Sequence, residues 1–211
     1  MKNSYNEYLK FFQSKESRKS FSLIGGNGCT MVSAPHSVEQ TREGKVKYGE
    51  YHTGVLARML YDDLKCPIIF KSFNDNDDAN YDEQSAYKES LKKYVIRNNI
   101  KYLIDLHQLA PYREVNIDLG TGFGKNISPY PEIIDIAKKH FIGNNISNIT
   151  IDNPFSAAYP HTISSYIFRE CQICCLQIEI NSRLISDKYA EFSFDQVLLS
   201  LKCIINELNK E

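Results

Sequence analysis

The stretch KYLIDLH, residues 101–107, decides the fold, because it predicts a strand buried inside a parallel sheet. Its nearly continuous apolar run is typical of strands that are covered on both faces. The run QICCLQIEIN, residues 172–181, predicts a second buried strand. Segments with helical periodicity, such as residues 49–64 and 194–209, alternate with the strands. Strands that alternate with helices predict an α/β fold with a mixed central sheet.

The length and composition are those of one globular unit. The chain has 211 residues, of which 42% are hydrophobic and 24% charged. No repeat or linker divides the sequence, so we expect a single domain over residues 1–211. A domain of this size folds without disulfides or a structural metal, so any bound metal is expected to be catalytic.

The charge pattern argues against two classes of partner. The 25 basic and 26 acidic side chains give a formal net charge of −1, and no basic stripe is interleaved with aromatic residues. We therefore expect no nucleic-acid partner. The first 20 residues are too polar for a signal peptide, and no segment approaches 18 consecutive apolar residues. These features predict a cytoplasmic protein with no membrane partner.

Two further motifs have structural interpretations. The run FSLIGGNGCTMVSAP, residues 21–35, predicts two strands that form a hairpin around a Gly-Gly-Asn-Gly turn. Cys171, Cys174 and Cys175 have a spacing that occurs in metal and redox sites, but no second Cys or His pair completes a set of four ligands. We interpret these cysteines as reduced thiols packed in the core.

Polar side chains follow three of the apolar runs. They form three pairs, namely His36 with Glu39, Asp105 with His107, and Glu179 with Asn181. Ligands of α/β sheets bind outside the carboxyl ends of the strands, so these side chains are expected to lie near one another. A catalytic zinc takes three protein ligands and leaves a position open for water. The three strand ends therefore predict a metal site.

Within this set, His36, Glu39 and His107 are the predicted zinc ligands. Glu39 is preferred over the nearby Glu43 and Glu50 only because it completes a His-x-x-Glu spacing. A metal hydrolase also needs a carboxylate base that is not a ligand, and Glu179 at the end of its strand is the candidate.

Asp105 lies two residues before His107 on the same side of the strand. It is a candidate for the carboxylate that fixes the imidazole tautomer.

Three motifs together carry a resemblance. They are SAPHSVEQTREG (33–44), IDLHQLAPYREVNIDLGTG (104–122) and CLQIEINSR (175–183). In this order they resemble the N-formylglutamate amidohydrolase-like family, which is related to zinc carboxypeptidases and aspartoacylases. The resemblance covers about residues 30–185. It implies a three-layer phosphorylase/hydrolase-like α/β fold, zinc on His36, Glu39 and His107, and Glu179 as general base.

A carboxylate-bearing substrate is expected to need a cationic anchor. Arginines bind carboxylates through paired hydrogen bonds, and Arg113 and Arg183 follow strand ends more directly than Arg42 does. Asn181 could donate to the substrate, and His161 lies in a loop that could reach it. The predicted partner is a small molecule or peptide with a free carboxylate.

The predicted function is a zinc-dependent amidohydrolase that uses metal-activated water and Glu179 to cleave an N-acyl amino acid of the N-formylglutamate type. A carboxypeptidase-type peptidase or a deacylase with another substrate is the alternative among enzymes. A binding protein that keeps the fold without catalysis is the alternative from another class. The completeness of the predicted set favours an enzyme, because a degenerate relative would lack a ligand or the base.

Overall fold

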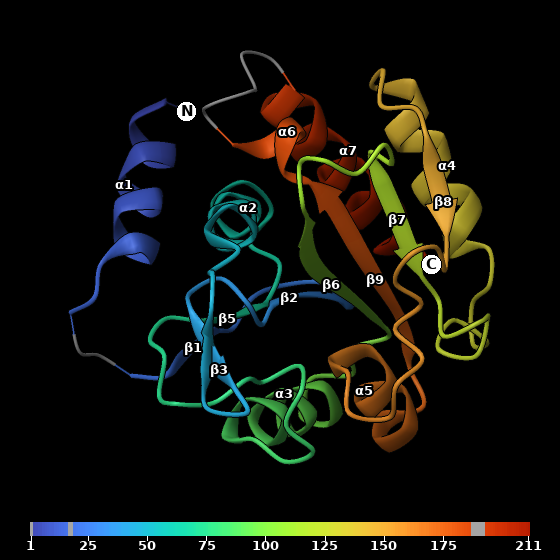
Figure 1. Ribbon diagram of the computed structural model, residues 1–211. Helices are drawn as coiled ribbons and strands as arrows, with labels where there is room; N and C mark the ends of the chain where they lie inside the picture. Colours follow the sequence, from blue (N-terminus) through green and yellow to red (C-terminus); the bar gives the residue numbers. More distant parts are fainter. Residues whose placement is uncertain (1, 17–18, 187–192) are drawn as a thin grey trace.

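A seven-stranded mixed sheet forms the centre of the computed structural model, which describes residues 2–16, 19–186 and 193–211 (Figure 1). Across the sheet, the strands are β1 (Phe21–Ile24), β5 (Ile68–Lys71), β2 (Thr30–Ala34), β6 (Tyr102–Leu109), β9 (Cys174–Asn181), β7 (Ile117–Gly120) and β8 (Ile149–Ile151). The neighbours from β5 to β9 run parallel, whereas β1 is antiparallel to β5 and β7 to β9. The predicted α/β class with a mixed sheet is confirmed.

Helices cover both faces of the sheet (Figure 1). One face carries α2 (Tyr51–Leu64), α4 (Ile133–Gly143), α6 (Ser182–Ile185) and α7 (Ser193–Leu208), with α1 (Lys2–Gln13) packed against α2. The other face carries α3 (Ala86–Arg97) and α5 (Ile163–Cys171). None of the helices in the described part of the chain is both long and apolar enough to cross a membrane.

On the α3/α5 face, the side chains of the central strands β6 and β9 change from apolar to polar along each strand. Every side chain of β9 is buried, as are those of β6 apart from Gln108. Because side chains alternate between faces, Leu103, Asp105 and His107 point to the same side of β6. The equivalent series on β9 is Cys175, Gln177 and Glu179. Both series become polar toward the carboxyl ends of the strands, which places the polar groups together at one edge.

The hairpin prediction for residues 21–35 is wrong in its pairing. Both strands form, but β5 lies between β1 and β2 and pairs with each of them. The glycine-rich loop passes over the α2–β5 connection, where Asn27 N–H donates to the Lys65 carbonyl at 2.7 Å. A Cβ on Gly26 would lie 2.1 Å from that carbonyl oxygen. The glycine therefore serves a close backbone approach and not a two-strand turn.

A second, two-stranded sheet lies between His36 and Glu50. It consists of β3 (Gln40–Arg42) and β4 (Lys45–Lys47), joined by Glu43 and Gly44 with φ of 52° and 73°. Two consecutive positive φ values are typical of the turn that matches the twist of a hairpin. This short insertion was not predicted.

The core-packing interpretation of the cysteines is confirmed for Cys174 and Cys175. Both are buried in β9, and each packs into a different hydrophobic core, on opposite faces of the sheet. Burial raises the pKa of the Cys174 thiol to about 12. All six cysteines are free thiols.

Candidate metal and active site

His36, Glu50 and His107 form the one cluster, within the described ranges, whose ligand atoms could hold a metal ion together. Their ligand atoms all lie within 4.8 Å of one another. His36 lies two residues beyond β2, His107 lies inside β6, and Glu50 directly precedes α2. The cluster therefore lies at the carboxyl ends of the central parallel strands, as predicted for the two histidines.

The Glu50 carboxylate joins the two imidazoles. Its Oε1 lies 3.1 Å from His36 Nδ1, and its Oε2 lies 3.5 Å from His107 Nδ1. Oε2 also accepts a hydrogen bond from the Gln108 N–H at 2.9 Å. Although Glu50 stands at the N-cap position of α2, its side chain makes no capping bond to that helix. Its carboxylate is directed to the histidines instead.

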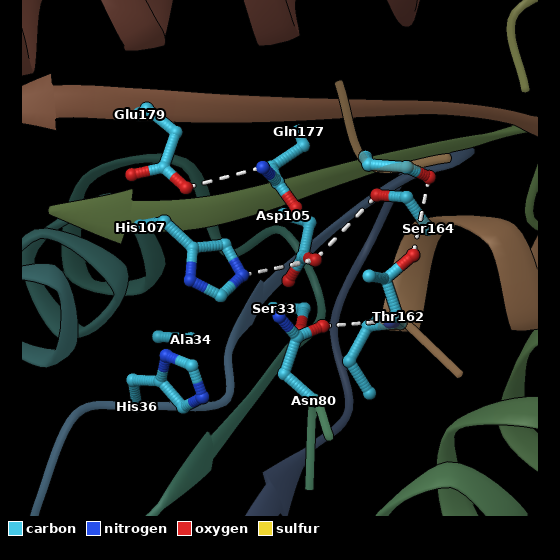
Figure 2. Close-up of polar contacts among 12 residues, drawn as sticks. Ser33, Ala34, His36, Asn80, Asp105, His107, Thr162, Ser164, Gln177 and Glu179 are labelled. Atoms are coloured by element: carbon cyan, nitrogen blue, oxygen red, sulfur yellow. Dashed lines mark hydrogen bonds and ion pairs between the residues drawn. The ribbon is translucent and has the colours of Figure 1, made fainter. Parts of the chain in front are cut away.

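The outer nitrogen of each imidazole also has a carboxylate partner. His36 Nε2 lies 2.8 Å from Asp78 Oδ1, and His107 Nε2 lies 3.3 Å from Asp105 Oδ2 (Figure 2 shows the latter pair). A histidine that donates one N–H to a carboxylate presents its other nitrogen as a metal ligand. Two such imidazoles and one carboxylate match the donor set of known catalytic zinc sites. The residues present therefore fit a zinc ion.

Glu39, the predicted third ligand, lies outside this cluster. Its carboxylate pairs with Lys15 at 3.3 Å, and Glu50 is the carboxylate that completes the cluster with the two histidines. The β3–β4 hairpin returns the chain to its starting point, so that Glu50 N–H donates to the His36 carbonyl at 2.7 Å. Gly49 permits this return, because a Cβ there would lie 2.6 Å from the backbone carbon of Val38.

Glu179 lies beside His107, directly opposite it in the register of β6 and β9 (Figure 2). The side chain is 7% exposed, and its Oε1 accepts a hydrogen bond from Gln177 Nε2 at 3.1 Å. Burial raises the pKa of Glu179 to about 8, against the opposing effect of His107. The structure thus brings the predicted base next to the histidine cluster.

The histidines in the cluster hold protons strongly when no metal competes for them. Burial alone lowers the pKa of His36, but the carboxylates of Glu50 and Asp78 outweigh it and raise that pKa to about 9. The pKa of His107 is likewise raised, because Asp105 and Glu50 outweigh burial. Burial would raise the pKa of Glu50, yet His36 and His107 lower it to about 2.

These shifts predict how the stability of the metal-free protein changes with pH. Between the ordinary pKa of a glutamate and about 8, native Glu179 binds more protons than it does in the unfolded chain, and between 6.5 and about 9 the same holds for His36. The free energy of unfolding must therefore fall as pH rises through this window, at about 1.4 kcal/mol per pH unit for each group, which amounts to several kcal/mol in all. Urea unfolding in the presence of a chelator, at pH 5 to 9, measures this change.

The Glu179→Gln variant is the control for that experiment. It removes the contribution of the Glu179 carboxyl, so the free energy of unfolding should depend less steeply on pH below pH 8. Added zinc should reverse the slope, because metal binding requires deprotonated imidazoles. A stability that rises from pH 5 to 9 with chelator present would contradict the shifts.

Asn181 and Arg183 hold a loop. Asn181 Nδ2 donates to the carbonyls of Arg113 and Val115, both at 2.9 Å, and its Oδ1 accepts from the Arg183 N–H at 3.0 Å. Arg183 Nη2 donates to the Arg113 carbonyl at 2.8 Å. Both amide donors of Asn181 are used in this way. The geometry therefore gives these two side chains a role in fixing the loop after β6. It leaves Asn181 no free amide donor, and a contact between Arg183 and a substrate remains a prediction.

Arg113 differs from Arg183 in that no donor of its guanidinium has a partner among the described residues. Its guanidinium carbon lies 5.1 Å from the ring centroid of Phe155 and 5.8 Å from that of Tyr112. Within the described residues, the guanidinium has neither a hydrogen-bond nor an ion-pair partner. Its backbone is held by Asn181 and Arg183 at the site edge of the sheet. Of the two predicted anchors, Arg113 therefore has more free donors, and the anchor role of either arginine remains a prediction.

His161 is not a member of the histidine cluster. Its ring stacks on Tyr159 at 5.6 Å and meets Tyr81 edge-on at 5.2 Å. It also lines an open groove of about 840 Å³ between α3 and α5. Burial, Lys88 and Arg42 lower the pKa of His161, which favours its neutral form. A contact between His161 and the substrate remains a prediction.

The sheet and its helical layers have the architecture of solved amidohydrolases and metallo-carboxypeptidases. N-formylglutamate amidohydrolase from Ralstonia eutropha JMP134 is 13% identical, and the match covers 92% of this chain and 99% of that chain with a TM-score of 0.62. Bacteriophage poly-gamma-glutamate hydrolase is 13% identical over 91% of each chain, with a TM-score of 0.57.

A metallo-carboxypeptidase from Burkholderia cenocepacia is 10% identical over 98% of this chain and 67% of that chain, with a TM-score of 0.54. No family model and no curated protein matches this sequence. The resemblance drawn from the three sequence motifs is therefore confirmed in the fold.

Proposed function

We propose that this protein is a zinc-dependent amidohydrolase that acts on a carboxylate-bearing substrate. The observation that carries the proposal is the His36–Glu50–His107 cluster with the buried carboxylate of Glu179 beside it. The solved structures with this fold include proteins named as an N-formylglutamate amidohydrolase and a poly-gamma-glutamate hydrolase. Both names describe hydrolysis of amides of glutamate, which supports the same substrate class here.

His36, Glu50 and His107 would hold the metal, with Asp78 and Asp105 fixing the two imidazoles. When bound, zinc would polarise the scissile carbonyl and make a water molecule more acidic. Glu179 accepts a proton from the attacking water at a carboxylate oxygen and later delivers it to the leaving nitrogen. Its buried position suits this role, because burial favours the protonated form that must exist between the two steps.

Arg113 is the proposed anchor for the substrate carboxylate. Its guanidinium lies against the aromatic rings of Tyr112 and Phe155, which limits its motion and leaves its donors free. The backbone hydrogen bonds from Asn181 and Arg183 hold the anchor at the site edge. A paired hydrogen bond to a carboxylate would then orient the amide toward the metal.

The metal content of the purified protein tests the proposal. We expect about one zinc per chain by inductively coupled plasma mass spectrometry, and loss of that zinc in the His107→Ala variant. His140→Ala is the matched control, because His140 pairs with Glu207 near the surface, outside the cluster. The control should keep its zinc.

A substrate panel then tests the reaction itself. N-formyl and N-acetyl derivatives of glutamate and aspartate, γ-glutamyl peptides and C-terminal peptide substrates are followed by release of the amine or acid. Cleavage of the N-acyl amino acids supports the proposal, whereas preference for peptides favours the carboxypeptidase alternative. Zinc without any hydrolysis favours a binding protein. Absence of metal after purification without chelator would overturn the metal site.

A further inference from the structure

The β3–β4 hairpin reaches the metal cluster through one arginine. Arg42, at the end of β3, donates from Nε and Nη2 to Asp78 Oδ2, at 3.0 and 2.8 Å. The other oxygen of that carboxylate, Oδ1, faces His36 Nε2 at 2.8 Å. The Asp78 side chain is fully buried. Its two oxygens are thus divided between the hairpin and a residue of the cluster.

The surroundings leave the Asp78 carboxylate little freedom to turn. Oδ1 also accepts from the backbone N–H groups of Asn80 and Tyr81, at 3.1 and 3.2 Å. The Asp78 N–H itself donates to Asp82 Oδ2 at 2.8 Å. The guanidinium of Arg42 lies over the Tyr81 ring, 4.5 Å from its centroid. The arginine is therefore held in place by the same loop that it binds.

This arrangement orients His36. A carboxylate fixed at Nε2 requires the proton of the neutral imidazole to be on that nitrogen, which leaves the lone pair of Nδ1 directed toward Glu50. Without Arg42, the Oδ2 atom of Asp78 would lose both of its hydrogen bonds from this side chain while remaining buried. Such a carboxylate would be expected to shift or to take up water, and the imidazole would lose its fixed partner.

We infer that Arg42 is a positioning residue of the metal centre, acting through Asp78 on His36. This inference rests on the proposed function, since it assumes that the cluster binds metal. It makes the hairpin between His36 and Glu50 part of the metal site, because the hairpin returns Glu50 to the cluster and also supplies the guanidinium that fixes His36. The hairpin therefore positions two of the three proposed ligands, His36 and Glu50.

The affinity of Arg42 variants for Co²⁺ and Zn²⁺ tests the inference. In competition with a chromophoric chelator, Arg42→Ala should bind both metals more weakly, by no more than the roughly 10–100-fold that loss of the direct outer partner Asp78 would cost. Arg42→Lys should recover part of the loss, because lysine supplies charge without the paired geometry. The absorption spectrum of the Co²⁺ form should change in Arg42→Ala.

Lys45→Ala is the matched control. Lys45 lies directly opposite Arg42 in the hairpin, and its replacement removes one positive charge from an exposed position. It should match the parent protein in affinity and spectrum. The double variant Arg42→Ala/Asp78→Asn should bind metal no more weakly than Asp78→Asn alone. If Arg42→Ala does not fold, Arg42→Lys carries the same comparison.

Equal metal affinities in the parent, Arg42→Ala and Arg42→Lys would overturn the role of Arg42 and leave the proposed function standing. Additive losses in the double variant would likewise overturn action through Asp78. A parent protein that binds neither metal would overturn the proposed function, and the inference with it. The two failures are therefore distinguished by the behaviour of the parent protein.

Discussion

Glu179→Gln is expected to lower kcat by about 10²–10⁴-fold while the fold and the metal content stay unchanged. Glutamine keeps the shape of glutamate, and Gln177 Nε2, 3.1 Å from Glu179 Oε1, can still donate to the amide oxygen. The amide cannot accept a proton from water, so the loss isolates proton transfer from packing. The measurement is kcat and KM, determined separately on the best substrate of the panel, together with zinc content.

The position of Glu179 explains why the effect should fall on kcat. The carboxylate lies beside His107 and is not a member of the His36–Glu50–His107 cluster, so its replacement should not release the metal. Glu114→Gln is the matched control, because it removes one carboxylate from an exposed position at the same edge of the sheet. Full activity in Glu179→Gln would rule out its role as the base, and loss of zinc would make it a ligand.

The fold could be predicted from the sequence because its central strands carry strong local patterns. Residues 101–107 and 172–181 are apolar runs that only a sheet covered on both faces can bury, and β6 and β9 form at these positions. The pairing of residues 21–35 could not be predicted in the same way. A glycine-rich turn between two strands favours a hairpin locally, but β5 (Ile68–Lys71), which follows both of them and α2 in the sequence, inserts between them.

Part of the candidate site was equally accessible from the sequence. His36, His107 and Glu179 each follow or end an apolar run, and parallel strands bring their carboxyl ends to one edge. The link between Asp105 and His107 also follows from sequence, since side chains two residues apart share a face of a strand. These residues could be grouped without knowledge of any loop.

The residues supplied by loops could not be identified in this way. Asp78 lies in an acidic stretch, residues 74–83, in which nothing distinguishes it from Asp75, Asp77 or Asp82. Glu50 did have a signal, because it follows Gly49 at the start of a predicted helix. The His-x-x-Glu spacing outweighed that signal, since the hairpin that shortens the distance from His36 to Glu50 was not recognised.

The choice between the two glutamates gives the second large prediction. Glu50→Gln should weaken zinc binding by more than about 100-fold, because loss of an outer partner alone costs about 10–100-fold and Glu50 is a proposed ligand. Its carboxylate also receives the Gln108 N–H and faces both imidazoles. Hydrolysis should fall with the metal content, and excess zinc should restore part of it. Competition with a chelator measures the affinity.

Glu39→Gln, in the same segment of the chain, is expected to leave zinc binding almost unchanged. Among the described residues, the Glu39 carboxylate has an ion pair with Lys15, whose side chain is 80% exposed, and such an ion pair contributes about 0–1 kcal/mol. Zinc affinity and kcat should therefore remain within about twofold of the parent protein. Loss of zinc in Glu39→Gln with retention in Glu50→Gln would restore the His-x-x-Glu ligand set. It would also require the hairpin to rearrange when metal binds, because Glu39 lies outside the cluster in this structure.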